Sequence, residues 1–385
     1  MRVDRPAAVA QDRSAIAPKW ARYQQHSHTS SPLLHPYSMP LGITATLLLG
    51  SLSFWWGTRF GRVLLRNGAT ANDLFTGKNS LSLLFLGMYV ALIAIALHVP
   101  QFHALPLEWR FYGLEVTWTI LRVVLLGFCG VTFIVSWQTA RPQVMAVALI
   151  GMLGLGCFTA AESYFLSPIY PSLIDNLRPN GIFQQTSASS CAPAALATVL
   201  HRWGISATES GVAKLAGTSR LGTSMPQLIV AAEGFGMDGL ELSPTWAQIR
   251  QINRPGVLAT WLYGENGRVA HAVALLTMDS EVATIADPAF GRIFRVPRGQ
   301  FDRIWRRQYV PIFRPTDLLL TPAQAADYLR RLDYVEDPQE DLPTSIRRFQ
   351  RIMGVESTGE LDPMTILLLT GPFLSDDVPT LRSPA

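Results

Sequence analysis

Cys191 stands where a thiol could act as a nucleophile. It precedes Ala192-Pro193 and an alanine-rich run to Leu200 whose apolar residues recur with a helical period. The serine pair before it and the proline after it are typical of the first turn of a capped helix. Because the dipole and free N–H groups at a helix N-terminus stabilise a thiolate, Cys191 is a candidate nucleophile. The alternative is a small buried thiol packed under the helix.

A cysteine nucleophile needs a base within reach, usually a histidine. Beyond residue 165 the sequence contains two histidines, His201 and His271. His201 follows ten residues later on the same predicted helix, which places it about 15 Å from Cys191. His271 is therefore the candidate base, by elimination.

An acidic residue is expected next to this histidine. His271 begins a short apolar run, Asp287 ends a second one, and the turn-forming residues 278–281 between them predict a β-hairpin. Positions equidistant from a turn face each other, so the Asp287 carboxylate should orient the imidazole and stabilise its protonated form. Each residue also has a simpler interpretation, as a hydrogen-bonded strand histidine and as a turn former before Pro288.

These residues belong to a longer series, which in chain order is Gln185, Cys191-Ala192-Pro193-Ala194, Gly222-Thr223-Ser224, His271-Ala272-Val273 and Asp287-Pro288-Ala289-Phe290-Gly291. Over about residues 180–315 the series resembles the C39 family of papain-like cysteine peptidases. The resemblance implies an α+β domain in which Cys191 attacks, His271 is the base and Asp287 orients it. It further implies that Gln185 donates to the oxyanion. Gln184 competes for that role, and the six-residue spacing to the cysteine favours Gln185.

The sequence departs from the best-known members of that family. They carry Asp-Cys-Gly at the nucleophile, where this chain has Ser190-Cys191-Ala192. They are also fused to ATP-driven exporters and remove leader peptides after a double glycine. This chain has no Gly-x-x-x-x-Gly-Lys-Ser/Thr phosphate loop, so ATP is not an expected partner. Cysteine pairs at metal-ligand spacing are absent too, and no metal or organic cofactor is expected.

The first part of the chain is unusually apolar. Charged residues make up 16% of the sequence, against about 25% in an average soluble protein. Roughly 20 apolar residues are needed to cross a bilayer as a helix. Four stretches are predicted to do so, with tryptophans near their ends: Met39–Trp56, Leu81–His98, Val116–Trp137 and Gln143–Ala161. Buried core helices are the alternative interpretation.

The charges in the loops predict an orientation. The first loop, Arg59–Lys78, is rich in basic residues, which places it in the cytoplasm and everything after residue 165 outside. The basic tail before the first span conflicts with this, and we expect translation to begin at Met39, which removes the conflict. Arg122, in the third span, is expected to extend towards the interface beside Glu115.

The C-terminal end predicts three short helices. They cover Thr321–Leu332, then Thr344–Val355 with Gly354 at its end, and a third that opens at Asp362-Pro363. Over about residues 318–372 they resemble the three-helix peptidoglycan-binding module of cell-wall hydrolases. That resemblance implies peptidoglycan as a partner. The simpler interpretation is a helical tail packed on the peptidase.

The predicted fold class is a multidomain membrane protein with a four-helix transmembrane region, an α+β papain-like peptidase domain and a small all-α C-terminal bundle. Its parts are a tail (1–38), the spans (39–165), a linker (166–179), the peptidase domain (180–316), the helical module (317–373) and a second tail (374–385). The partners expected are a peptide or protein substrate, the lipid bilayer and peptidoglycan. Nucleic acid is not expected, because the net charge is only +4 and no Lys/Arg block is interleaved with aromatics.

The predicted function is a cysteine peptidase in the bacterial cytoplasmic membrane that hydrolyses peptide bonds outside the cell, close to the wall. One alternative uses the same thiol on wall peptides or for acyl transfer, as transglutaminase-like enzymes do. Another is a catalytically silent receptor whose cleft only binds peptide. Intact Cys191, His271 and Asp287 disfavour the receptor.

Overall fold

The computed structural model describes residues 38–70, 87, 90–91, 94, 107–264, 267–337 and 339–382. The predicted N-terminal tail up to residue 37 and most of the second predicted span, Leu81–His98, lie outside these residues. The predictions made for those segments therefore stay predictions.

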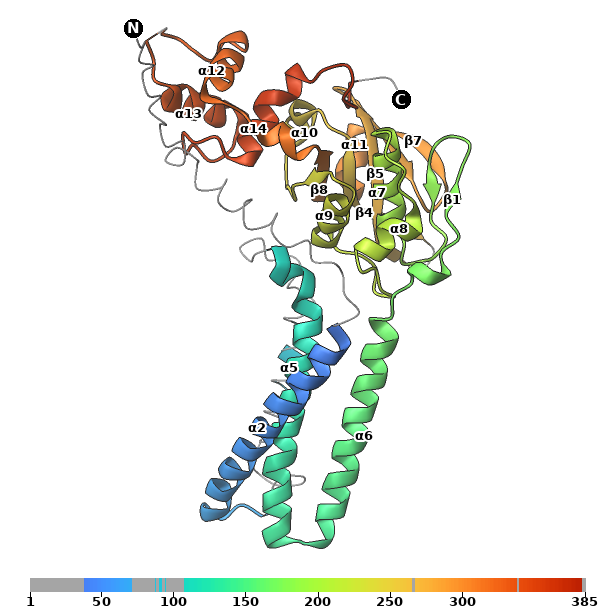
Figure 1. The fold of residues 1–385 in the computed structure, drawn as a ribbon, viewed down its shortest axis with the longest axis vertical. Helices are drawn as coiled ribbons and strands as arrows, with labels where there is room; N and C mark the ends of the chain where they lie inside the picture. The colour runs from blue at the N-terminus through green and yellow to red at the C-terminus, as the bar shows by residue number, and fades with distance from the viewer. Residues whose placement is uncertain are drawn as a thin grey trace, which may run out of the picture. The chain divides into compact units, whose positions relative to one another are not determined.

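Three long helices precede the sheet: α2 (Ser38–Arg66), α5 (Leu107–Thr139) and α6 (Pro142–Phe165). Helices α2 and α5 lie side by side, and glycines let their backbones meet (Figure 1). A Cβ atom on Gly57 would fall 2.1 Å from the Gly127 carbonyl oxygen, and one on Gly130 would fall 2.2 Å from that of Phe54. Such close approach through small residues is typical of helix pairs in membranes.

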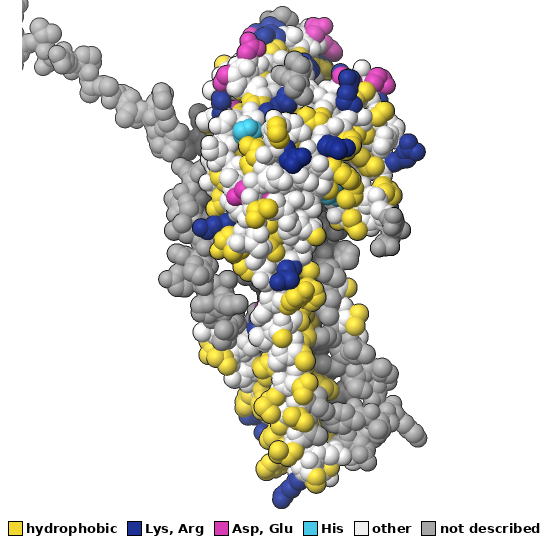
Figure 2. Space-filling view, turned by 90° about the vertical axis from the view of Figure 1, so that its right-hand side faces the viewer, with side chains coloured by type: hydrophobic (Ala, Val, Ile, Leu, Met, Phe, Trp, Pro, Cys, Tyr) yellow, Lys and Arg dark blue, Asp and Glu magenta, His cyan; other side chains and the backbone are white. Residues whose placement is uncertain are grey.

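Two segments of the described chain, Val116–Thr139 and Pro142–Phe165, are long and apolar enough to cross a membrane, judged by length and composition. Helix α6 exposes large apolar side chains such as Met145, Leu149 and Met152. Figure 2 shows hydrophobic side chains gathered over the long helices. These two segments match the third and fourth predicted spans. The first falls within α2, which is not one of the two, so the four-span prediction is supported only in part.

Arg122 differs from its prediction. Its Nη1 atom pairs with Glu162 Oε2 of α6 at 3.0 Å, and Arg122 is 7% exposed. Helices α5 and α6 are joined by a tight turn at Ala140–Arg141 and pack against each other, which brings Arg122 level with Glu162. A buried guanidinium that can reach a carboxylate on the neighbouring helix pairs with it instead of extending along its own helix.

The second half of the chain is built on a six-stranded antiparallel sheet with the order β3-β8-β4-β5-β6-β7. Its strands are β3 (Asp238–Gly239), β4 (Gly256–Gly264), β5 (Gly267–Met278), β6 (Val282–Asp287), β7 (Arg292–Pro297) and β8 (Trp305–Phe313). A separate two-stranded ribbon pairs β1 (Asn176–Leu177) with β2 (Phe183–Gln184). Short 3₁₀ helices occur at Tyr170–Ser172, Pro315–Leu318 and Gly371–Phe373.

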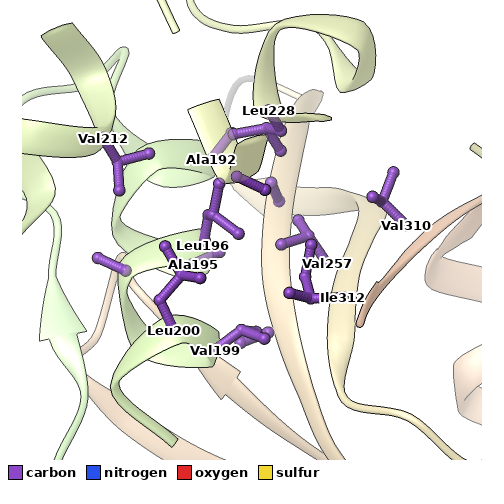
Figure 3. Close-up of a cluster of buried hydrophobic side chains, with 14 of the residues drawn as sticks. Ala192, Ala195, Leu196, Val199, Leu200, Val212, Leu228, Val257, Val310 and Ile312 are labelled. Carbon is purple, nitrogen blue, oxygen red and sulfur yellow. The ribbon is translucent and has the colours of Figure 1, made fainter. Parts of the chain in front are cut away.

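One face of the sheet is covered by α7 (Cys191–Arg202) and α9 (Met225–Gly234), and α8 (Glu209–Leu215) packs on these two helices. Helix α7 packs on strands β5, β4 and β6. Its buried Ala195, Leu196, Val199 and Leu200 belong to one hydrophobic cluster with Ala272 and Ala274 of β5, Val257 of β4, and Val310 and Ile312 of β8, part of which is drawn in Figure 3. The alanine-rich face of α7 lets the helix approach the sheet closely. The helix that begins with Cys191 is thereby fixed against the strands that carry the rest of the site.

Further helices complete the fold: α10 (Trp246–Ile252), α11 (Arg298–Ile304), α12 (Pro322–Arg331), α13 (Leu342–Met353) and α14 (Pro363–Thr370). The last three are the C-terminal helices predicted from the sequence. Gly354 ends α13 with a left-handed φ of 70°, as its position predicted. Asp362 caps α14 by accepting a hydrogen bond from the Thr365 N–H.

The C-terminal helices share a buried contact with the segment that joins α10 to β4. Arg254, which is fully buried, donates to the Leu367 carbonyl (3.5 Å) and the Thr370 hydroxyl (3.2 Å) of α14. Its Nε atom lies 3.7 Å from Asp317 Oδ2. Asn253 Nδ2 donates to the Gly371 carbonyl at 3.0 Å. A buried cation held in this way ties the C-terminal helices to the segment before β4.

Gly371 offers a test of this contact. A Cβ atom there would fall 1.9 Å from the Gln251 carbonyl oxygen and 2.7 Å from that of Ile252. We expect Gly371→Ala to lower the free energy of unfolding by about 1–3 kcal/mol, because the C-terminal helices must move away from α10. Thermal unfolding of the full chain measures this. Gly299→Ala is the control, since its Cβ would meet no atom within 4 Å, and equal melting of the two variants would contradict the account.

Candidate active site

Three side chains from separate elements meet on the sheet: Cys191 at the start of α7, His271 in β5 and Asp287 at the end of β6. His271 Nε2 lies 2.7 Å from Asp287 Oδ1, and both residues are 7% exposed. The imidazole also hydrogen-bonds the Cys191 side chain. Because Nε2 is taken by the carboxylate, Nδ1 is the nitrogen left for the sulfur. The structure thus brings together the three residues that the sequence singled out.

The predicted hairpin is confirmed. Strands β5 and β6 pair antiparallel with Ala274 opposite Ala286, and the register shifts between Leu275 and Thr277. If the register at Ala274 is continued, Asp287 lies opposite Val273. The imidazole of His271 therefore reaches the carboxylate diagonally along one face of the sheet, a distance that a ring can span.

A turn after β6 holds the Asp287 carboxylate in place. Oδ1 accepts a second hydrogen bond from the Ala289 N–H at 2.9 Å, and the Asp287 carbonyl accepts one from the Gly291 N–H at 2.9 Å. Gly291 has φ of 60°, a left-handed conformation that favours glycine. The Asp-Pro-Ala-Phe-Gly motif therefore fixes the orientation of the carboxylate as well as its position.

Gln185 lies beside this turn, and its N–H donates to the Pro288 carbonyl at 3.0 Å. Its side-chain Nε2 donates to the Ser187 carbonyl at 3.0 Å, while the buried Oε1 has no hydrogen-bond partner among the described residues. An amide NH₂ carries two hydrogens, so one remains for a ligand. Gln184, the competing residue, ends β2 and accepts from Asn176 Nδ2 at 3.3 Å.

The start of α7 departs from the prediction in one respect. The helix begins at Cys191 as expected, but Ser190 forms no side-chain cap. Its hydroxyl instead donates to the Ser187 carbonyl at 2.9 Å and accepts from the Ser187 N–H at 3.0 Å. These hydrogen bonds within the short loop 187–190 replace the helix cap that the hydroxyl could otherwise form. The serine therefore does not occupy the helix N–H groups next to Cys191.

The imidazole of His271 has unusual electrostatics. Burial by itself lowers its pKa, but the hydrogen bonds with Asp287 and Cys191 and the charges of those groups outweigh burial and raise the pKa to about 9. His271 is therefore a cation at neutral pH and can donate a proton to a leaving group. His201, at the far end of α7, stacks edge-on against Phe183 at 6.4 Å, away from the site as predicted.

A cleft of about 270 Å³ opens over Cys191. Cys191 and His271 line it, together with the Gly222-Thr223-Ser224 segment noted in the sequence. Three polar residues from the sheet side also line it, Glu241, Arg306 and Gln308, and Gln308 Nε2 donates to Glu241 Oε1 at 3.0 Å. Sequence reasoning missed these three, because they belong to no motif and meet only through sheet pairing.

Comparison with known proteins agrees with this site. Residues 180–317 match the Peptidase C39 family. Uncharacterised proteins of Methanothermobacter thermautotrophicus and Methanothermobacter marburgensis are each 37% identical over 136 residues, which cover 35% of this chain and 90% of each relative. Through these residues the chain belongs to the Peptidase C39 family, as the sequence motifs predicted, and it is a cysteine peptidase.

Solved structures were also found to be similar. The peptidase domain of Streptococcus ComA, described as a bifunctional ABC transporter involved in quorum sensing, is 18% identical with a TM-score of 0.31. That match covers 34% of this chain and 96% of the domain. A double glycine motif protease from an AMS/PCAT transporter, in complex with a leader peptide, is 22% identical with a TM-score of 0.31 and covers 34% and 90%.

The raised pKa of His271 predicts the alkaline limit of activity. We expect kcat/KM for peptide hydrolysis to fall as the pH rises through about 9, because the imidazolium loses the proton that the leaving amine requires. Asp287→Asn should move this limb to lower pH, since the carboxylate no longer raises the pKa of the ring. A pH profile of kcat/KM for both proteins tests this, and an unmoved limb in the variant would contradict it.

Proposed function

We propose that Cys191, His271, Asp287 and Gln185 form the catalytic machinery of this peptidase. The observation that carries the proposal is the 2.7 Å contact of His271 with Asp287, on a ring that also hydrogen-bonds Cys191. A nucleophile, a proton carrier and a group that orients the carrier are the parts that thiol acyl transfer needs.

In the proposed reaction, the Cys191 thiolate attacks the carbonyl carbon of the scissile amide. The first N–H groups of α7, together with the Gln185 amide, donate to the oxyanion that forms. His271 then gives its proton to the departing amine, which leaves an acyl-enzyme on the sulfur. Water, deprotonated by His271, attacks the acyl carbon, which releases the carboxylic acid product and regenerates the Cys191 thiolate beside the imidazolium. Asp287 keeps the ring oriented and its charge compensated throughout.

Substitutions of the four residues test this assignment. We expect Cys191→Ala and His271→Ala each to lower kcat at least about 10⁴-fold, because nucleophile and base act as a unit. Asp287→Asn should cost less, about 10²–10⁴-fold, and Gln185→Ala about 10²-fold. His201→Ala is the matched control and should keep full activity. Wild-type turnover by Cys191→Ala, with unchanged thermal unfolding, would show that another residue is the nucleophile.

The same experiment separates the alternatives. A silent receptor would bind peptide without turnover in any variant. An acyltransferase would pass the acyl group to an added amine faster than to water, and mass spectrometry of the products identifies which acceptor was used. Membership of the C39 peptidase family supports hydrolysis as the reaction.

We further propose that the long helices anchor the peptidase in the cytoplasmic membrane with residues 165–382 outside the cytoplasm. Gly50 faces Leu126 and Gly61 faces Ile134, so α2 and α5 run in the same direction. The exposed arginines at the end of α2, together with Arg141 in the α5–α6 turn, therefore gather at one end of the helices. The positive-inside rule assigns that end to the cytoplasm and the opposite end, where α6 stops, to the outside.

Reporter fusions test this topology in the full chain. An alkaline phosphatase joined after residue 382 should be active, since it folds only outside the cytoplasm, and a fluorescent protein at the same place should stay dark. The same pair inserted at residue 70, after the arginines of α2, should give the opposite result. A fluorescent fusion after residue 382 would place the peptidase in the cytoplasm and contradict the proposal.

The C-terminal helices are proposed to hold the enzyme at the cell wall by binding peptidoglycan. The proposal is supported by their resemblance to the wall-binding module and by the extracytoplasmic side proposed for them. Because Arg254 donates to α14, removing the module would break these hydrogen bonds and expose the surface that the module covers, which would destabilise the rest of the chain. Binding is therefore tested with the full chain, by its co-sedimentation with purified sacculi at low salt.

A further inference from the structure

A bulge in β8 places an arginine at the active-site cleft. Ala259 of β4 pairs with Gln308, whereas the next residue, Thr260, pairs with Trp305. Arg306 and Arg307 are therefore extra residues on β8, and Arg307 has φ of 63°, which is rare for a residue other than glycine. Backbone strain of this kind persists where the surroundings impose it, often beside functional sites.

The bulge positions Arg306 in the wall of the cleft that Cys191 and His271 also line. Its guanidinium carbon lies 4.6 Å from the centre of the Trp261 ring, and that of Arg268 lies 4.5 Å from the same ring. A guanidinium next to an aromatic ring is held in position yet keeps its N–H groups free at the edges. Arg306 is thus a fixed cation at the nucleophile.

This cation has no carboxylate partner among the residues that the structure describes. The arginines that pair with a carboxylate there are others: Arg122, Arg254, Arg314, Arg330, Arg331 and Arg348. Glu241, the acidic residue of the same cleft, accepts a hydrogen bond from Gln308. Burial lowers the pKa of the Arg306 guanidinium, so the charge has lost water without gaining an anion.

We propose that Arg306 selects substrates with a carboxylate side chain, glutamate or aspartate, next to the scissile bond. A guanidinium binds a carboxylate through two parallel hydrogen bonds, which offset its lost hydration. Small neighbours in the cleft, Ala259, Ala270 and Ala272, leave room for such a side chain. The inference rests on the proposed function, because it requires Cys191 to be the residue that attacks.

Matched thiol-directed probes test the inference without requiring turnover. Four peptidyl vinyl sulfones, to which a thiolate adds covalently, would carry Glu or Gln at the first or second residue before the reactive group. The rate of adduct formation on Cys191 is followed by mass spectrometry of the intact full chain. The proteins are wild type, Arg306→Gln, Arg306→Lys and, as a control for net charge, Arg295→Gln, which changes an exposed arginine of β7.

At one of the two positions the Glu probe should react with wild type about 10- to 100-fold faster than the Gln probe. Arg306→Gln should bring the ratio close to one, Arg306→Lys should retain part of it, and Arg295→Gln should leave it unchanged. A ratio near one in wild type, or one that Arg306→Gln does not change, would overturn the inference. The inference would also be overturned if none of the four probes reacted with a chain in which iodoacetamide still labels Cys191. Labelling of a different residue would instead overturn the proposed function.

Discussion

The hydrogen bond between His271 and Asp287 is the interaction on which the site depends. It sets which ring nitrogen faces the sulfur and keeps the imidazole charged at neutral pH. The same carboxylate is fixed by the Ala289 N–H, and the neighbouring Pro288 carbonyl accepts from the Gln185 N–H. One turn at the end of β6 therefore positions the proton carrier and the residue proposed to meet the oxyanion.

Packing determines whether Cys191, the proposed nucleophile, can reach that ring. Helix α7 lies on the sheet through small side chains, of which Ala194, Ala195 and Ala197 are fully buried. Their size sets the distance from the helix axis to β5, and thus from Cys191 to His271. A misplacement of about 1 Å at a reacting atom can cost a hundredfold in rate, so this alanine face serves catalysis as well as stability.

Local signals explain what could be predicted from the sequence. The β5–β6 hairpin, the start of α7 at Cys191 and the glycine that ends α13 each depend on a few adjacent residues. The interactions that were not predicted join residues far apart in the sequence. Arg122 of α5 pairs with Glu162 of α6, and Arg254 donates a hydrogen bond to Thr370 of α14. Arg306 enters the cleft only because β8 carries two extra residues against β4, which no spacing in the sequence announces.

The most direct measurement of this account is an NMR titration of the full chain with labelled histidines, in which His271 is assigned by comparison with the His271→Ala variant. The account predicts that His271 titrates at about 9 and that Asp287→Asn moves the titration to clearly lower pH. A His271 that titrates near the unperturbed value of about 6.5 in both proteins would contradict it. The imidazole would then not be held by Asp287, and the proposed proton transfer would lose its structural basis.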